Sequence, residues 1–596
     1  MFFQVFICSF LCTSRLKGPC IIKKLRKPFI QKATLVVVLV TTCIFICSSS
    51  APLKNNLPML NLNMITSPKT FDPRKAGDVY SSQMIFLLFE GLTKRYPDGS
   101  IKLAQAKSYK VSDDKLTYTF MLGDNYWSNG KPVTAYDFEQ SWKDILNPKF
   151  PSTGDYQFAP IKNAKKARKG LVPLNEVGIK AIDEKILVIT LEHPTPYLLK
   201  VLSQPCFYPI SIEQDQKNPN WVCQTGAQFV CNGPFILESF KQGDQIVLTS
   251  NPYYRKIKDK HPPKITFNIV ENNHVTLEMF KQGTVDMIGD SLTNIPLEEI
   301  SELEKTWTFN LEAQPFSVFI NLNTTKRPFN NVKIRRAFAL AINRQELIEI
   351  LGKGCKKNIK TDSITPAYKA GLCATNLVAP CLKENRCTEF FKDNDVIQAN
   401  ILLNEGMAEL GITKEAFKSL TFFYYPRIYA NEIVQVIQQQ WAKAFGIFIK
   451  LEKLDFSIVL DKLNNYDYSM CFFCWLAFYD DPMNVLERFK YKNYTMNHPR
   501  WEHPKFIELL DRSNYEEGDK RLLTLEQAEK VLIDDMPVIP LYHRYYVYLI
   551  NPELEFNVSL WGDRLLFPFT PEQKQTKKEN KHSHIKQKSK NPSVKK

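Results

Sequence analysis

Two kinds of hydrophobic pattern alternate along the first half of the chain. Short runs rich in β-branched and aromatic residues, closed by Gly, Pro, Asp or Asn, are typical of strands and turns. Four such runs are KLTYTFMLGDN, KILVITLEHP, QIVLTSNP and KITFNIVEN. Helical periodicity appears between them in VYSSQMIFLLFEGL and in AYDFEQSWKDIL, and the second of these follows Thr134, a residue type that favours helix N-termini. This half is therefore predicted to mix helices and strands.

From Val332 onward the helical patterns become longer. The periodicity predicts one long amphipathic helix in VKIRRAFALAINRQELIEIL, another in ANEIVQVIQQQWAKAF followed by a strand in IFIKLEKL, and a helix in RLLTLEQAEKVLIDD before the aromatic strand VIPLYHRYYVYLINP. We expect a second α/β lobe here. The 596 residues exceed one core, and 44% hydrophobic with 23% charged residues is close to the globular average, so neither a disordered chain nor a polytopic membrane protein is indicated.

Most of the net charge of +16 lies at the two ends of the chain. Residues 1–47 carry seven Lys or Arg and no acid, and the segment from Pro571 carries nine Lys and two Glu. The body between them is nearly neutral, which makes it a poor electrostatic match to a polyphosphate, so nucleic acid is not expected as a partner. Residues 571–596 are Lys-, Gln- and Ser-rich with almost no apolar side chains, and they are predicted to form a basic disordered tail.

Residues 1–50 have the features of an export segment. The basic cluster KKLRK precedes the apolar run ATLVVVLVTTCIFIC, which has the length of a signal-peptide core and is short for a membrane span. The run ends at Cys47, followed by SSS, which resembles a bacterial lipoprotein site where the cysteine is acylated. Cys43 is the other lipidation candidate, and signal-peptidase cleavage near Ser50 or Ala51 is the alternative. We expect an exported protein in the bacterial periplasm or at the cell surface.

Export makes disulfides possible, and nine cysteines follow Cys47. Cys223 and Cys231 flank a short polar loop, and their pairing is the simplest disulfide to propose. Four others in one Gly- and Pro-containing segment could pair among themselves: Cys355, Cys373, Cys381 and Cys387. The motif CFFC at 471–474 has the spacing of a redox or metal pair, but a metal site needs about four ligands, so we predict a structural strand there.

Motifs that carry catalysis are mostly absent. The sequence contains no GxSxG, no HExxH, no phosphate-binding GxxxxGK[ST] and no GxGxxG after a strand. Because members of a triad can come from anywhere in a fold, this weakens the enzyme interpretation without removing it. We predict no catalytic residue, no metal and no cofactor.

A series of segments along the chain carries a resemblance to a known family. Residues 103–142 combine a strand, a Trp-Ser-x-Gly turn and the helix that follows, and the other blocks are TFDPRKAGDVYSSQMIFLLFEGL, CNGPFILESFKQGDQIVLTSNPYY, RPFNNVKIRRAFALAINRQELI and MPVIPLYHRYY. In this order they resemble the extracytoplasmic solute-binding proteins of oligopeptide and dipeptide ABC transporters, known as solute-binding protein family 5. The resemblance runs from about Met59 to Phe569.

The resemblance implies an α/β fold of two lobes with a hinge, the type II periplasmic-binding-protein fold with an extra N-terminal subdomain. Lobe I would combine residues 51–80, 193–313 and 535–570, with the extra subdomain at 81–192 and lobe II at 314–534. Such proteins close their lobes over the ligand. Family members hold peptides in an extended form, largely by main-chain hydrogen bonds, which gives affinity with little sequence preference.

Two parts of the chain are candidates for the ligand cleft. The resemblance places an aromatic residue of the loop PSTGDYQF in the cleft, which makes Tyr156 and Phe158 candidates. It also matches CWLAFYDDP, residues 474–482, to the cleft strand, where a Trp is followed three residues later by an Asp that pairs with the α-ammonium of the peptide. Trp475 is present here, but the third residue on is Phe478.

The missing carboxylate leaves three alternatives, because an enclosed ammonium without a counter-ion costs on the order of several kcal/mol. Asp480 or Asp481 could rotate into the cleft, although both match a turn that usually has structural roles. Another acid could reach across the cleft. We favour the third alternative, a ligand without a free ammonium at this point, held against an aromatic wall of Trp475, Phe478 and Tyr479. A shifted register with Phe478 in the core is the competing structural interpretation.

We therefore expect a receptor that captures oligopeptides, modified or amine-blocked peptides included, by lobe closure and delivers them to an ABC importer. Expected partners are the permease and ATPase subunits of the transporter and the membrane, through a lipid anchor, and the protein is expected to be a monomer. The alternative is a surface-exposed or sensory binding protein for a non-peptide solute, uncoupled from transport, which the Lys-rich tail supports. An enzyme is the third and weakest interpretation.

Overall fold

The computed structural model describes residues 59–96, 99–254, 262–289, 292–351, 371–386, 388–426, 430–552 and 554. The predicted export segment with Cys43 and Cys47, the basic tail, and Cys355 and Cys387 lie outside these residues. None of the helices in the described ranges is long and apolar enough to cross a membrane.

The first sheet brings together strands from the start and the middle of the chain. Its order is β1-β10-β9-β8, with β1 parallel to β10 and the other neighbours antiparallel. The strands are β1 (Leu60–Met64), β8 (Phe235–Lys241), β9 (Gln245–Ser250) and β10 (Lys264–Ile269). The strands predicted in QIVLTSNP and KITFNIVEN are therefore confirmed as β9 and β10.

A second four-stranded sheet forms within the part of the chain predicted to be an extra subdomain. It is antiparallel in the order β4-β5-β7-β6. The strands are β4 (Ala106–Val111), β5 (Thr117–Leu122), β6 (Ile179–Ala181) and β7 (Ile186–Thr190), and β2 (Thr93–Arg95) and β3 (Ile101–Leu103) pair beside them. Buried and less buried residues alternate along β7, so one face packs on the core.

The α3 helix (Ala135–Leu146) covers this second sheet and begins where the sequence predicts. Thr134 caps it: the backbone N–H of Asp137 donates to the Thr134 hydroxyl, and the Asp137 carboxylate accepts from the Thr134 backbone N–H at 2.8 Å. Phe138, Trp142 and Ile145 are fully buried on its inner face.

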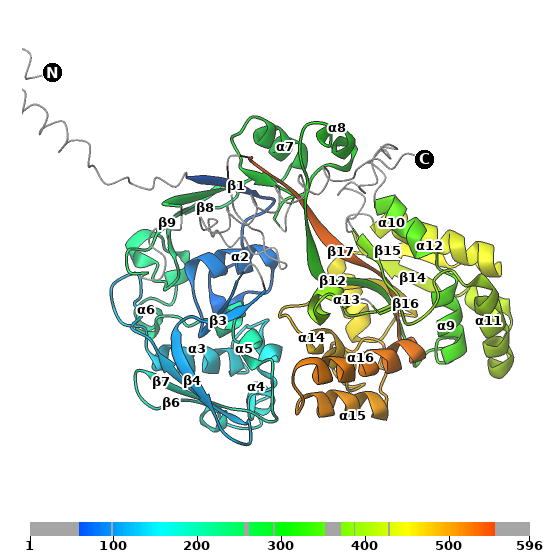
Figure 1. Ribbon diagram of the computed structural model, residues 1–596, viewed down its shortest axis with the longest axis horizontal. Coiled ribbons are helices and arrows are strands. Elements are labelled where there is room, and N and C mark those ends of the chain that lie inside the picture. Colours follow the sequence, from blue (N-terminus) through cyan, green and yellow to red (C-terminus); the bar gives the residue numbers. More distant parts are fainter. Residues whose placement is uncertain are drawn as a thin grey trace, which may run out of the picture. The chain divides into compact units, whose positions relative to one another are not determined.

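The third sheet contains the two longest strands, β12 (Asn310–Leu322) and β17 (Val538–Ile550). Its order is β11-β17-β12-β16-β14-β15, and β13 also pairs with β17. The remaining strands are β11 (Met287–Ile288), β13 (Gly371–Cys373), β14 (Thr421–Tyr424), β15 (Lys450–Lys453) and β16 (Met470–Leu476). In Figure 1, β12 and β17 lie side by side, and their antiparallel pairing shifts register between Ala313 and Ser317 and again between Val318 and Phe319.

Helices surround the sheets (Figure 1). Those of the first half are α2 (Val79–Leu88), α3, α4 (Ala164–Arg168), α5 (Leu198–Val201), α6 (Ile212–Lys217), α7 (Asn273–Lys281) and α8 (Ile300–Leu303). Those of the second half are α9 (Val332–Leu340), α10 (Arg344–Leu351), α11 (Val396–Leu410), α12 (Ala430–Phe445), α13 (Phe456–Asn464), α14 (Met483–Leu486), α15 (Pro504–Ser513) and α16 (Gly518–Asp535).

The helix predicted across residues 332–351 is two helices, α9 and α10. The α9 helix ends at Leu340, and the backbone N–H of Glu346 donates to the side-chain oxygen of Asn343 at 3.1 Å, which caps the start of α10. The backbone N–H of Asn343 also donates to Gln440 of α12 at 3.0 Å. A polar residue that satisfies the backbone in the middle of the run therefore interrupts the helix, although the hydrophobic period continues across it.

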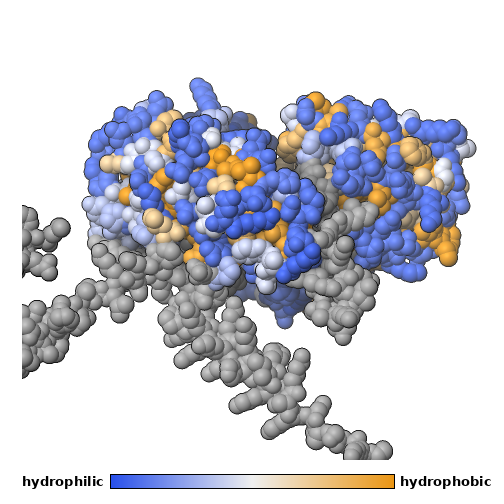
Figure 2. All heavy atoms as spheres, turned by 90° about the horizontal axis from the view of Figure 1, so that it is seen from above, coloured by the Kyte–Doolittle hydropathy of each residue, from blue (hydrophilic) through white to orange (hydrophobic). Residues whose placement is uncertain are grey.

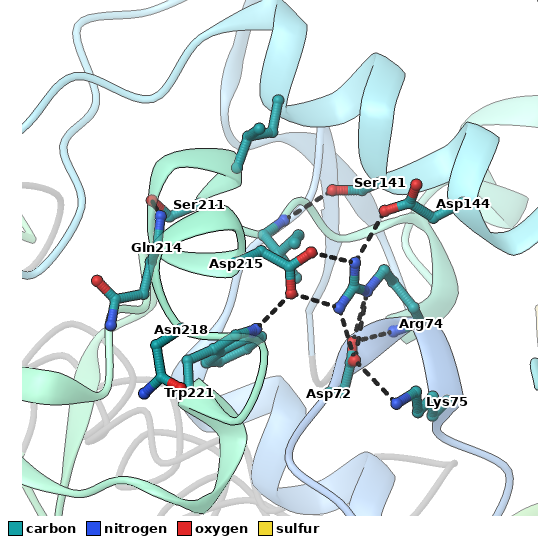
Figure 3. Close-up of polar contacts among 12 residues, drawn as sticks. Asp72, Arg74, Lys75, Ser141, Asp144, Ser211, Gln214, Asp215, Asn218 and Trp221 are labelled. Atoms are coloured by element: carbon teal, nitrogen blue, oxygen red, sulfur yellow. Dashed lines mark hydrogen bonds and ion pairs between the residues drawn. The ribbon is translucent and has the colours of Figure 1, made fainter. Parts of the chain in front are cut away.

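A buried ion cluster ties distant segments together around Arg74 (Figure 3). The guanidinium is 5% exposed and forms ion pairs with Asp72 at 2.9 Å, Asp144 of α3 at 2.8 Å and Asp215 of α6 at 2.9 Å. Trp221 donates its indole N–H to Asp215 at 2.8 Å. Hydrogen bonds and charges from the aspartates hold the pKa of Arg74 above its usual value despite burial. The cluster fixes the N-terminal segment against the second sheet's helices.

Hydrophilic residues predominate on the face of the molecule drawn in Figure 2, with hydrophobic residues in scattered patches. The large hydrophobic side chains with the highest exposure include Ile397 of α11 and the loop residues Leu171 and Phe448. Single exposed hydrophobic residues of this kind are normal for a soluble surface.

Candidate functional site

The segment CWLAFYDDP leaves the end of β16 and turns into α14. Directly after β16, the backbone N–H of Ala477 donates to the backbone carbonyl of Pro315 in β12 at 2.8 Å. The side-chain oxygen of Asn484 then accepts from the indole N–H of Trp475 at 3.0 Å and from the backbone N–H of Phe478 at 3.2 Å. One amide group therefore fixes the orientation of both predicted cleft residues.

A pocket of about 340 Å³ lies between this segment and residues 155–201. Tyr156, Trp475 and Tyr479, three of the residues proposed for the ligand cleft, line this pocket. Phe478 packs between the first two, with ring centres 5.9 Å from Tyr156 and 5.4 Å from Trp475. Aromatic residues from two distant parts of the sequence thus form one wall.

Phe158 does not reach the pocket, and this prediction is wrong. The 3₁₀ helix Asp155–Phe158 directs Tyr156 outward, 41% exposed, and Phe158 inward, fully buried. Phe158 stacks on Phe207 with ring centres 4.2 Å apart and meets Trp142 edge to face. It therefore belongs to the core beneath the pocket.

Asp481 is held in a structural ion pair rather than directed at the pocket of Trp475. Its carboxylate accepts from the Arg521 guanidinium at 2.7 and 2.8 Å and from the backbone N–H of Met483 at 3.0 Å, and the side chain is 3% exposed. It faces a second cavity, lined also by Tyr197 and Arg521. The prediction that Asp481 could rotate toward the ligand is therefore not supported.

Asp480 is half-buried and is also absent from the lining of the Trp475 pocket. Burial raises the pKa of its carboxyl, although the positive charge of Lys200 opposes this. Lys200 donates instead to the backbone carbonyl of Asp480. Neither aspartate of the turn therefore replaces the missing carboxylate at Phe478.

Tyr479 is the best-anchored of the predicted wall residues. Its ring stacks on Tyr197, with centres 5.4 Å apart and planes 7° from parallel, and the guanidinium of Arg521 lies 5.3 Å from the Tyr197 ring centre. Burial raises the pKa of both tyrosines well above 10, so both hydroxyls stay protonated. The hydroxyls can act as hydrogen-bond donors.

The sequence analysis missed the charged residues of the pocket, among them Glu487 and Arg488. Both line it from the 3₁₀ helix Glu487–Phe489, directly after α14. Glu487 is half-buried, and its side chain has no hydrogen-bond or ion-pair partner among the described residues. Arg488 is 6% exposed, and its guanidinium carbon lies 3.9 Å from the centre of the Trp475 ring. The sequence carries only a weak signal for these two residues, namely an adjacent Glu-Arg pair shortly after the turn at Asp480 and Asp481.

Several contacts join the two sides of the site. Arg95 donates to the backbone carbonyl of Phe478 at 3.2 Å, and Lys165 donates to the Tyr494 hydroxyl at 3.2 Å. Farther from the pocket, Lys115 pairs with Glu517 at 2.6 Å. The two sides are therefore in direct contact across the site.

The predicted disulfide between Cys223 and Cys231 is not formed. Cys223 is exposed, whereas Cys231 is buried with its thiol directed at the backbone carbonyl of Phe235, 3.3 Å away. The CFFC motif lies in β16, which confirms the strand prediction. Within the described ranges, no group of His, Cys, Asp and Glu could hold a metal ion.

Comparison with known proteins shows which proteins this chain resembles. Residues 100–497 match the model of the bacterial extracellular solute-binding proteins, family 5. The oligopeptide-binding protein OppA of Bacillus subtilis is 34% identical over 491 residues, covering 81% of this chain and 87% of that protein. A probable deoxycholate-binding periplasmic protein of Escherichia coli, YgiS, is 27% identical over 82% of this chain and 89% of its own length.

A solved structure gives the same answer for the fold. The periplasmic oligopeptide-binding protein OppAIV of Borrelia burgdorferi is 27% identical, with a TM-score of 0.69, covering 86% of this chain and 98% of that one. The two-lobed α/β fold expected from the resemblance is thereby confirmed.

Proposed function

Because the chain belongs to the bacterial extracellular solute-binding proteins of family 5, we propose that it captures oligopeptides outside the cytoplasm and delivers them to an ABC importer. The observation that carries this proposal is the pocket whose aromatic wall comes from two distant segments, Tyr156 on one side and Trp475 with Tyr479 on the other. Such a wall binds side chains and backbone without demanding one sequence.

Closure of the two lobes traps the ligand. The hinge lies in the paired strands β12 and β17, where the register shifts between Ala313 and Phe319 support a local bend. The contacts of Arg95 with Phe478 and of Lys165 with Tyr494 cross the site, so they belong to the closed state and break on opening. The lobe and subdomain boundaries of the sequence analysis remain part of this proposal.

The ligand does not need a free α-ammonium at the Trp475 end of the pocket. Phe478 stands where the resemblance calls for an aspartate, and Asp481 is committed to Arg521. Modified or amine-blocked peptides are therefore accepted. Glu487 is the pocket carboxylate that could substitute, since its side chain has no partner within the described part of the chain.

The remaining parts of the proposal concern location and partners. The protein is exported, anchored to the membrane through Cys47, monomeric, and works with permease and ATPase subunits, without nucleic acid. It binds its ligand and does not transform it, in keeping with a family of solute-binding proteins.

A second candidate function is binding of a non-peptide solute without coupling to transport. The relative named for deoxycholate supports it, because a steroid acid fits an apolar aromatic pocket that carries a cation.

Calorimetric titration of the exported protein tests the proposal. The titrants are a mixed-sequence tetrapeptide pool with free or acetylated N-termini, and deoxycholate. We expect the acetylated pool to bind at least as tightly as the free pool. A tenfold preference for free amines would contradict our interpretation of Phe478, and loss of that preference in Glu487→Gln would identify Glu487 as the substitute. Heat from deoxycholate alone would support the second function.

A further inference from the structure

Arg488 presents a buried positive charge to the pocket. Its side chain is 6% exposed and lines the cavity beside Tyr156 and Trp475. The guanidinium lies against aromatic rings, 3.9 Å from the Trp475 ring centre and 5.4 Å from that of Phe489. Aromatic faces stabilise a cation, but they accept none of its N–H groups as a carboxylate does.

The hydrogen bonds of this guanidinium are incomplete. Nη2 donates to the backbone carbonyl of Met496 at 3.3 Å. The buried Nε and Nη1 atoms have no hydrogen-bond partner in the described part of the chain, and no carboxylate there lies within ion-pair distance of Arg488. Two N–H-bearing nitrogens on different edges of the guanidinium are therefore left without an acceptor from the described part of the chain.

Other buried arginines of the molecule are compensated. Arg74 has three carboxylates, Arg521 has the carboxylate of Asp481 on two nitrogens, and Arg335 donates to the backbone carbonyls of Phe329 and Asp535. A buried cation without an ion-pair partner destabilises the folded state. A shorter or apolar side chain at the same position would avoid this destabilisation. Burial lowers the pKa of Arg488 to about 9, so the group still carries its charge at neutral pH.

We infer that Arg488 receives a carboxylate of the bound ligand at the Trp475 end of the pocket. This inference deepens the proposed peptide-binding function and rests on it. A carboxylate complements the guanidinium in charge and supplies hydrogen-bond acceptors for its N–H groups. In a peptide it comes from the C-terminus or from an Asp or Glu side chain.

The other charges of the pocket are consistent with an anion at this end. Asp155, a second acid of the lining, is paired with Arg168 at 3.2 Å. Glu487 lines the same pocket, and its carboxylate is not within ion-pair distance of Arg488 or of another cation in the described part of the chain. The end of the pocket at which the resemblance places an ammonium is thus a cationic end here.

Calorimetry with three N-acetylated tetrapeptide pools tests this inference, since acetylation removes any contribution of the amine. One pool has a free C-terminus, one an amidated C-terminus, and one an amidated C-terminus with Asp or Glu at one position. We expect at least tenfold tighter binding of a pool that carries a carboxylate than of the neutral pool. Tighter binding of the first pool than of the second indicates a C-terminal carboxylate, and tighter binding of the third than of the second indicates a side-chain carboxylate.

Two variants separate this role from a structural one. Arg488→Met should remove the preference for carboxylates, while the unliganded protein melts at the same or a higher temperature, because an uncompensated buried charge has been removed. Lys166→Met removes a nearby charge on an exposed residue that does not line the pocket, and it should keep the preference. Equal binding of all three pools, or an unchanged preference in Arg488→Met, would overturn the inference.

Failure of the proposed peptide-binding function can be told apart from failure of the inference about Arg488. If no peptide pool binds, the proposed function is wrong, and deoxycholate, itself a carboxylate, decides the inference. Binding of deoxycholate that is lost in Arg488→Met would support the role of Arg488. No binding, or binding that the variant leaves unchanged, would overturn it.

Discussion

The carboxylate of Asp481 and the guanidinium of Arg521 join β16's turn to α16 through two hydrogen bonds of 2.7 and 2.8 Å. Both side chains are almost fully buried, with exposed fractions of 3% and 8%. Removing one partner of such a pair leaves the other as an uncompensated buried charge.

We therefore predict that Asp481→Asn lowers the free energy of unfolding by about 3–5 kcal/mol. Asp480→Asn is the matched control, because its half-buried carboxylate forms no ion pair within the described residues, and it should change stability by less than about 1 kcal/mol. Urea denaturation of both variants measures the difference. Equal effects would mean that the Asp481–Arg521 pair does not stabilise the turn.

The two aromatic residues of the 3₁₀ helix before α4 should separate stability from binding. Phe158→Ala removes a fully buried ring, and we expect a loss of about 3–5 kcal/mol in stability. Tyr156→Ala removes a 41% exposed ring of the pocket wall, so peptide affinity should fall while stability changes by less than about 1 kcal/mol. Thermal melts and calorimetry on both variants check this. An affinity loss confined to Phe158→Ala would contradict the assignment of the wall.

His498 should make the protein less stable in acid. Burial, and next the charge of Arg488, lowers its pKa to about 3, whereas an unfolded histidine titrates near 6.5. Between these values the unfolded state binds a proton that the folded state does not, so this contribution to stability is present above about pH 6.5 and is lost as pH falls toward 3.

The unmodified protein and His498→Gln should differ in how steeply the free energy of unfolding changes with pH. Below about pH 6, His498 contributes up to about 1.4 kcal/mol of unfolding free energy per pH unit, and His498→Gln should lack this contribution. Urea denaturation at several pH values between about 4.5 and 6 compares the two proteins, with the buried His543 present in both. Parallel curves would show that His498 titrates normally in the folded state.

The cysteines predicted to pair should differ in reactivity. Cys223 is exposed and should be alkylated in the native protein, whereas burial raises the pKa of Cys231 to about 12 and should protect it. Peptide mapping by mass spectrometry after native alkylation reports both sites. A Cys223–Cys231 cross-linked peptide from the non-reduced exported protein would contradict the free thiols of the structure.

Much of the architecture could be predicted because local signals agreed with tertiary packing. The strand in QIVLTSNP is β9, and the helix after Thr134 begins at Ala135 with the capping residue that the sequence offers. The division between α9 and α10 could not be predicted from periodicity, because the apolar spacing continues past Asn343 and only the hydrogen bonds to Glu346 and Gln440 interrupt it.

The site was harder to predict because side-chain direction depends on tertiary contacts. Tyr156 and Phe158 are both aromatic and two positions apart, and the tight turn of a 3₁₀ helix decides which one packs on Phe207. Arg488 could not be distinguished from a surface arginine in the sequence. Its significance comes from the ring of Trp475 and from the lack of a carboxylate within ion-pair distance in the described part of the chain.

The pairing of β12 with β17 has a consequence for biosynthesis. Residues 310–322 find their strand partner only at residues 538–550, and β11 at 287–288 pairs with the end of that same strand. The third sheet cannot be completed until nearly the whole chain has left the ribosome, so its folding is necessarily late and non-local. A chain truncated before Val538 would leave β12 with an open edge, which is a surface prone to aggregation.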